Sequence, residues 1–240
     1  MWGSTPADAR LGAMSVELHR SHSRPVSRAD GRETRHSLSF GEHYDPANPG
    51  FGPMVCHNDD VLAPTAGYPD HPHSSLEIVT WVLEGALVHT DATGARHVLE
   101  AGRAQVLSAG SGTRHSEVAD AASGRCRFVQ VWLRPDDPDG EPSYVAGEAP
   151  GPGSGLHVVV GPGGLPVGTA RARLSVGRLA PGERVALPDA PLLHVFAATG
   201  AVAVGGVDLH PGDAVRLTDV GGLDVVATDE AELLAWSFGD

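Results

Sequence analysis

The sequence predicts an all-β protein, and three observations support this prediction. Short runs rich in β-branched and aromatic residues recur along the chain, among them EIVTWVL, RFVQVWL, LHVVV and LLHVFAATGAVAV. Glycine and proline, at 31 and 19 residues, fall between these runs, as turn residues do in β-sandwiches and β-barrels. No segment shows a convincing helical pattern longer than two turns.

The two halves of the chain resemble each other in pattern. Residues 83–110 and 198–221 each give a glycine turn, an alternating strand, a hairpin, a second glycine turn and another strand. Such self-similarity indicates one supersecondary unit used twice. A single irregular β-sandwich is the alternative.

In chain order, residues 1–13 carry no pattern and are expected to be a disordered or spurious extension, so that Met1 and Met14 are both candidate starts. The first domain then covers residues 14–135. A polar, proline-rich tract makes residues 136–155 the expected linker. The second domain covers residues 156–240.

Composition excludes several classes of partner. The formal net charge of -13, from 30 acidic and 17 basic residues, argues against direct binding to nucleic acid or to anionic membranes. No apolar run approaches the roughly 20 residues of a membrane span, and the N-terminus does not read as a signal peptide. Two cysteines provide no disulfide framework, and Cys56 is expected to be a buried, inert thiol. We therefore expect a cytoplasmic protein.

Two pairs of polar residues stand out as candidate metal ligands. His71 and His73 are two residues apart before a strongly β-forming run, and His115 and Glu117 are two apart after a glycine-rich turn. On a strand, residues i and i+2 point to the same face, so each pair projects together. If both strands line one barrel, three imidazoles and a carboxylate converge. That ligand set leaves positions open and suits Fe(II), and also Mn, Ni or Cu.

The same residues resemble the pirin family of the cupin superfamily. The resemblance rests on HPHSSLEIVTWVLEG (71–85), SAGSGTRHSE (108–117), SFGEHYDP (39–46), GFGPMVCHNDDVLAP (50–64) and VQVWLRP (129–135). It implies a bicupin, two antiparallel β-barrels facing each other, with one metal, usually iron, in the first barrel. Mn, Ni, Cu or Zn are alternatives. Carried over, the ligands are His71, His73, His115 and Glu117.

The second half offers no matching ligands. When the halves are aligned on Gly85 and Gly200, His71 and His73 fall on Ala186 and Pro188. When they are aligned on Gly102 and Gly212, His115 and Glu117 fall on Val225 and Ala227. We therefore expect the second barrel to lack a metal.

Glu77 is a further candidate. It lies four residues after His73 and would point inward along an uninterrupted strand, where it could orient a ligand or act as a base. It could equally sit at a strand end. The other histidines on or near strands lack a partner at metal spacing and are expected to be surface or core residues: His57, His89, His97, His194 and His210.

The resemblance implies a function. Several bacterial pirins are metal-dependent dioxygenases that open the ring of flavonols such as quercetin with O2, and Glu117 or Glu77 would take the substrate's hydroxyl proton. One alternative is a cupin that acts on another small phenolic. The other is an iron-bearing regulator whose oxidation state alters its affinity for a protein partner, for which the acidic surface favours a basic protein.

Overall fold

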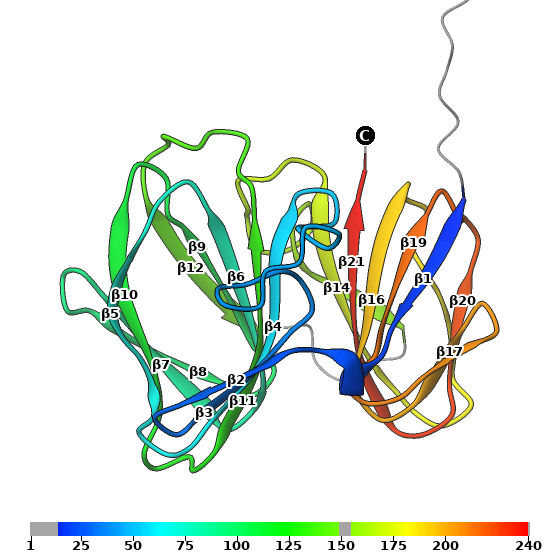
Figure 1. Cartoon of the computed structure of the whole chain (residues 1–240), viewed down its shortest axis with the longest axis horizontal. Coiled ribbons are helices and arrows are strands. Elements are labelled where there is room, and N and C mark those ends of the chain that lie inside the picture. The colour runs from blue at the N-terminus through cyan, green and yellow to red at the C-terminus, as the bar shows by residue number, and fades with distance from the viewer. Residues whose placement is uncertain (1–13, 149–154, 240) are drawn as a thin grey trace, which may run out of the picture.

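The computed structural model describes residues 14–148 and 155–239, and it forms two antiparallel β-barrels side by side (Figure 1). The prediction of an all-β bicupin is confirmed, and the alternative of a single irregular sandwich is wrong. The predicted extension 1–13 lies outside the described residues. No helix in the described part is long and apolar enough to cross a membrane.

The first barrel consists of a seven-stranded sheet, in the order β12-β9-β6-β11-β4-β3-β2, and a four-stranded sheet, in the order β5-β10-β7-β8. Its strands are β2 (Val26–Ala29), β3 (Arg32–His36), β4 (Met54–Leu62), β5 (Gly67–His73), β6 (Glu77–Glu84), β7 (Ala86–Asp91), β8 (Arg96–Glu100), β9 (Arg103–Ser108), β10 (Thr113–Ala119), β11 (Cys126–Leu133) and β12 (Ser143–Glu148).

The second barrel consists of a six-stranded sheet, in the order β1-β19-β16-β21-β14-β13, and a four-stranded sheet, in the order β15-β20-β17-β18. Its strands are β1 (Ser15–His19), β13 (Leu156–Val160), β14 (Ala172–Leu179), β15 (Arg184–Ala186), β16 (Leu192–Thr199), β17 (Val202–Val204), β18 (Val207–Leu209), β19 (Ala214–Thr218), β20 (Asp224–Ala227) and β21 (Ala231–Phe238). A short 3-10 turn, Ser21–Ser23, follows β1.

The internal repeat has a physical counterpart in its first glycine turn. Gly85 and Gly200 have φ values of 69° and 64°, a region that favours glycine. A Cβ atom on Gly85 would lie 2.2 Å from the carbonyl oxygen of Arg125, and one on Gly200 would lie 2.1 Å from that of Glu230. The same turn therefore passes equally close to a neighbouring backbone in both barrels.

The expected domain boundaries differ from the observed ones at two strands. The first domain is expected to begin at residue 14 and so to include β1, but β1 pairs with β19 of the second barrel, from Ser15↔Thr218 to His19↔Ala214 (Figure 1). β12 falls within the expected linker, but it pairs with β9 and extends the large sheet of the first barrel. Composition did not reveal either strand, because an edge strand is half exposed and lacks the apolar run of a central one.

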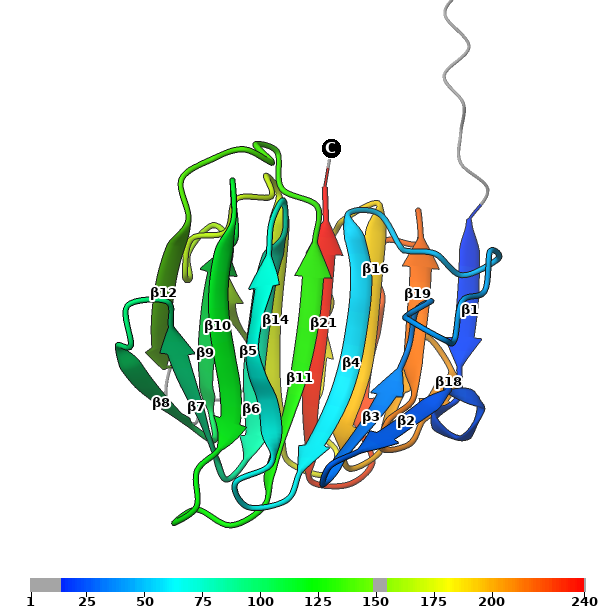
Figure 2. The ribbon, with the colours of Figure 1, turned by 60° about the vertical axis from the view of Figure 1, so that its left-hand side comes forward.

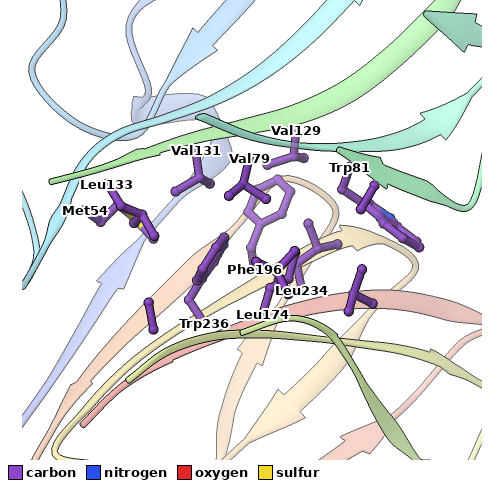
Figure 3. Packing of buried hydrophobic residues seen from close by; sticks show 14 of the residues in the cluster. Met54, Val79, Trp81, Val129, Val131, Leu133, Leu174, Phe196, Leu234 and Trp236 are labelled. Carbon is purple, nitrogen blue, oxygen red and sulfur yellow. The ribbon is translucent and has the colours of Figure 1, made fainter. Parts of the chain in front are cut away.

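An apolar seam joins the barrels, and Figure 3 shows its side chains interdigitating. β6 and β11 contribute Val79, Trp81, Val129 and Val131, and the facing strands contribute residues that include Leu174, Phe196, Leu234 and Trp236. Burial of both faces explains why β6 reads as a nearly continuous apolar run. The indole of Trp81 also donates a hydrogen bond to Glu232 across the seam, at 2.6 Å.

Aliphatic side chains fill the second barrel, and Val225 and Ala227 are among them. In the first barrel, His115 pairs with His71. Val225, the position matched to His115, pairs with Val185, so the counterpart of His71 is Val185 and not the predicted Ala186. The connections to the next strand differ in length, residues 74–76 against 187–191, so counting back from the glycine misplaces the match. Val185 is buried in the barrel and has no ligand atom to offer.

Candidate metal centre

The two predicted ligand pairs lie on neighbouring strands of the first barrel, β5 and β10 (Figure 2). His115 is the register partner of His71, whereas Glu117 is the partner of Tyr68, so the register shifts by one between them. This bulge places an extra residue in β5. Because a bulge re-aims the side chains that follow it, Tyr68 and His71 face the same cavity although they are three positions apart.

Three imidazoles meet at this point. The ligand nitrogens of His71, His73 and His115 lie within 4.8 Å of one another, and the ring centroids of each pair are 4.5–5.2 Å apart. His115 is fully buried and the other two are half-buried. The structure thus brings together the three histidines that the sequence singled out.

The tautomer of His71 follows from its backbone contact. Its Nδ1 lies 2.7 Å from the carbonyl oxygen of Pro69, which can only accept a hydrogen bond. Nδ1 therefore carries the proton, and the lone pair of Nε2 is free for a ligand.

His115 has an imidazole as its second contact. Its Nδ1 lies 3.3 Å from Nδ1 of His89, and its buried Nε2 has no hydrogen-bond partner among the described residues. A buried nitrogen without a partner is costly unless something occupies the space before it. This orphaned atom, beside two other imidazoles, fits a metal ion.

Two of the three imidazoles have lowered pKa values. Burial, together with the neighbouring His71, lowers the pKa of His73 to about 4. Burial likewise lowers the pKa of His115 to about 3, with His71, His89 and His73 adding to the effect. Neutral imidazole is the form that ligates a metal, so His73 and His115 need lose no proton at neutral pH.

Glu117 stands deeper in the barrel than the three histidines. Its two carboxylate oxygens accept hydrogen bonds from Gln105 at 2.6 Å and from Gln130 at 2.8 Å. Burial raises the pKa of its carboxyl group, while the bond from Gln130 opposes that rise. Glu117 does not join the cluster of three histidines, but it forms a second group within 4.8 Å with His115 and His89.

Sequence reasoning did not assign His89 to the site. It lies on β7, is fully buried, and is the register partner of Glu117 on β10. Its ring packs on Tyr144 with centroids 4.5 Å apart, and Tyr144 packs on His97 at the same distance. A sequence pattern does point to His89. It lies two residues after Leu87 in the strand that follows Gly85, so it shares the inward face of that strand with an aliphatic residue.

Of the two expectations for Glu77, the structure has the strand end and not the inward-facing position beside the histidines. The strand breaks after His73, where Ser75 takes a positive φ of 56°, so Glu77 begins β6 facing the second barrel. One carboxylate oxygen accepts hydrogen bonds from Ser108 at 2.7 Å and from the backbone N–H of Gly168 at 2.9 Å. It does not line the cavity beside the histidines. Glu77 fastens a loop of the second half to the first barrel.

Replacing Glu77 by Ala should therefore lower the free energy of unfolding by about 1–3 kcal/mol, because the N–H of Gly168 loses its acceptor. Glu77→Gln keeps an acceptor oxygen and should cost less. Urea unfolding of both variants checks this, and equal stability of Glu77→Ala and the parent chain would contradict the assignment.

A cavity of about 270 Å³ opens beside the three-histidine cluster. This is near the lower end of the roughly 300–1,000 Å³ typical of small-molecule sites. Phe40, Tyr68 and Trp132 give it aromatic walls, and Glu117 and Gln130 lie in its lining. The Trp132 indole donates to Gln130 at 2.9 Å, which holds the amide that binds Glu117.

A buried carboxyl group supports one aromatic wall. Asp60 accepts hydrogen bonds from the hydroxyls of Tyr68, at 2.6 Å, and Thr34. Burial raises the pKa of Asp60 to about 7. Nothing in the sequence pattern singled out this residue, which orients the Tyr68 hydroxyl that faces the cavity.

The remaining candidates lie apart from the centre. His57 and His194 are fully buried and contact each other across the seam, with ring centroids 4.6 Å apart. His97 and His210 are exposed. Cys56 is buried, and burial raises the pKa of its thiol, as expected of an inert cysteine.

Comparison with known proteins assigns both halves. Residues 18–133 match the family "Pirin", and residues 169–236 match the "Quercetinase C-terminal cupin domain". A Mycobacterium tuberculosis protein named "Putative quercetin 2,3-dioxygenase" is 40% identical over 230 residues, covering 92% of this chain and 94% of its own. A quercetin 2,3-dioxygenase of Escherichia coli is 35% identical over 129 residues, covering 54% of this chain and 56% of its own.

The fold has a solved counterpart. The crystal structure of the bacterial pirin YhhW from Escherichia coli, in complex with nickel(II), superposes with a TM-score of 0.87 at 28% identity, covering 94% of this chain and 99% of that one. The two barrels, the matched family regions and the extent of the similarity agree, and the chain belongs to the pirin family.

Proposed function

We propose that the protein is a metal-dependent dioxygenase that opens the heterocyclic ring of flavonols such as quercetin with O2. The observation that carries the proposal is the cluster of three imidazoles beside an aromatic-lined cavity. The names of the mycobacterial and Escherichia coli relatives supply the substrate class.

His71, His73, His115 and Glu117 are the proposed ligands of one divalent ion, with Fe(II) as the proposed metal. When bound, the ion supplies Lewis acidity toward the flavonol oxygens and redox chemistry toward O2. Three nitrogen donors and one oxygen donor leave coordination positions open, which a closed structural site would not.

The chain's own residues bind the substrate and move a proton. Phe40 and Trp132 provide faces on which a planar flavonol stacks, and the Tyr68 hydroxyl, which donates its hydrogen to Asp60, can accept a hydrogen bond. Glu117 is the proposed base for the 3-hydroxyl proton, because its carboxylate lies in the cavity lining and is held by two amide donors. Glu77 faces the second barrel, so Glu77→Gln should retain turnover.

The decisive experiment combines metal content with turnover. The purified chain, loaded with Fe(II) under exclusion of air and then exposed to O2, should bleach the quercetin absorbance and release carbon monoxide. Elemental analysis of the protein as purified identifies its resident metal. Unchanged flavonol absorbance with a fully loaded protein would refute the proposed activity while leaving the metal assignment standing.

His89 should affect metal affinity from outside the ligand set. If His115 presents Nε2 to the ion, its Nδ1 carries the proton and donates to Nδ1 of His89. His89→Phe keeps a ring against Tyr144 but removes that acceptor, and we expect metal affinity to fall by roughly 10–100-fold.

His97→Phe is the matched control, because His97 also packs on Tyr144 but is exposed. Metal titration of both variants, followed by a competing chelator, provides the measurement. Equal affinities for the two variants would show that His89 does not hold His115.

A further inference from the structure

A second, smaller cavity lies where the chain crosses from one barrel to the other. Residues 20–25 link β1 of the second barrel to β2 of the first, and they form part of the wall of a half-open cavity of about 190 Å³. The described residues that line it include two arginines, two histidines, two serines and an asparagine, but no Asp or Glu. In a chain with 30 acidic residues, such a lining is unusual.

Arg24 is the central charge of this cavity. It is 6% exposed, and its guanidinium donates to the carbonyl oxygens of Gly212 at 3.0 Å and Arg35 at 2.7 Å. Asp59 lies 3.8 Å away, but both of its oxygens already accept hydrogen bonds from Arg127 at 2.9 Å. One carboxylate therefore serves two guanidinium groups.

Arg216 adds a second buried charge beside the same cavity. It is 5% exposed and donates to the side chain of Asn48 at 2.8 Å and to the carbonyl of Ser37 at 3.1 Å, and both residues line the cavity. Within the described part of the chain, no carboxylate lies within ion-pair distance of Arg216. Glu17 is the register partner of Arg216 on β1 but forms no ion pair with it, so this buried guanidinium has no direct counter-charge among the residues that the structure describes.

Three side-chain nitrogens of residues that line or adjoin this cavity have no hydrogen-bond partner in the described part of the chain. Nε of Arg24, Nε of Arg216 and Nε2 of His19 are buried without a hydrogen-bond partner among the described residues, although the Glu17 carboxylate lies 3.7 Å from Nε2 of His19. A guanidinium Nε carries a hydrogen and cannot accept, so whatever satisfies it must be an acceptor. Burial lowers the pKa of Arg24 to about 10, and the neighbouring Asp59 only partly offsets this effect.

A larger groove nearby serves as a contrast. It measures about 870 Å³ and is also rich in arginine, but Glu33, Asp59 and Asp213 lie in its lining. Asp213 pairs with Arg20 at 2.7 Å, and Glu33 pairs with Arg35 at 2.7 Å. Its charges are largely matched within the chain. In the smaller cavity, Arg20 shares that pairing with Asp213, whereas Arg24 has only Asp59, which Arg127 already binds.

We propose that the smaller cavity is a binding site for a small oxyanion of the carboxylate or phosphate class, held by Arg24 with His19 and the neighbouring Arg216. The volume corresponds to roughly six water molecules at about 30 Å³ each, which is ample for such an ion. Arg24 already joins Gly212 of the second barrel to Arg35 of the first. An anion on Arg24 therefore ties the crossing segment to both barrels and stabilises the folded chain.

The test uses the full chain at constant pH and ionic strength, with phosphate or acetate replacing chloride. At least one of the two oxyanions should raise the melting temperature along a saturating curve, and the arm that responds identifies the class. Arg24→Gln should weaken the apparent affinity at least tenfold. Arg96→Gln, an exposed position on β8, is the matched control and should respond like the parent chain.

The anion can also be located directly in the parent chain, which does not depend on the folding of Arg24→Gln. Crystals of the parent chain grown with selenate should show an anomalous peak within hydrogen-bonding distance of the Arg24 guanidinium. A melting temperature that rises linearly, equally in all variants and without a selenate peak, would overturn the proposal, because that pattern reports general salt effects only.

Discussion

Replacing His73 by Ala should leave the purified chain with almost no bound metal and no measurable flavonol turnover. His73 is one of three imidazoles whose nitrogens lie within 4.8 Å of one another, and among the described residues no fourth histidine belongs to this group. Loss of a partner outside the ligand set costs roughly 10–100-fold in metal affinity, and loss of a ligand should cost more.

The fold should survive this substitution. His73 is half-buried at the end of β5, and its side chain packs against Trp132 with ring centroids 5.0 Å apart. We expect a change in the free energy of unfolding of about 1 kcal/mol or less. His210→Ala, at an exposed position outside the centre, is the control and should retain both metal and turnover.

Elemental analysis and oxygen uptake with quercetin measure the two expectations separately. A His73→Ala protein that holds one metal per chain would show that the three histidines are not the ligands. A protein that loses its metal but still consumes quercetin would instead remove the metal from the mechanism.

The ligand cluster could be predicted from sequence because its members are close in the chain. Each pair occupies positions i and i+2 of a strand, and a strand's alternation alone decides that both members face one side. His89 could not be found this way, since its contact with His115 depends on the pairing of β7 with β10 and not on local spacing. The bulge in β5 that aligns Tyr68 with Glu117 is equally invisible in the pattern.

The errors have a common physical cause. The inward-facing position of Glu77 depends on counting along a strand that Ser75 interrupts. The match of His71 to Ala186 depends on counting across a connection that differs in length between the two barrels. Counting works within an unbroken strand and fails across turns, because the side-chain period of two turns a one-residue slip into a change of face. The domain boundaries predicted for β1 and β12 follow sequence order. Packing, however, decides which barrel an edge strand joins.

Phe196→Ala should produce the largest loss of stability of the substitutions considered. Phe196 is fully buried in the seam, where its ring meets His57 edge-on at 4.9 Å and lies under the Arg24 guanidinium at 5.3 Å. Truncation of a buried Phe costs about 3–5 kcal/mol, a large part of the 5–15 kcal/mol that holds an ordinary domain. Tyr44→Ala, which removes an aromatic ring that is 71% exposed, should change the unfolding free energy by no more than about 0.5 kcal/mol.

The shape of the transition is as informative as its midpoint. Trp81 and Trp132 report on the first barrel and Trp236 on the second, while far-ultraviolet circular dichroism reports on both. The barrels share the seam and are joined by the hydrogen bonds Trp81–Glu232 and Glu77–Gly168. β1, which precedes the first barrel in the chain, pairs in the second, so the loss at Phe196 should destabilise both barrels together. Coincident urea transitions at a lowered midpoint are the expected result, because neither barrel can keep its seam-facing sheet covered alone. Two separated transitions in the Phe196→Ala variant would show that the barrels fold independently and that the seam contributes little to the first barrel's metal centre.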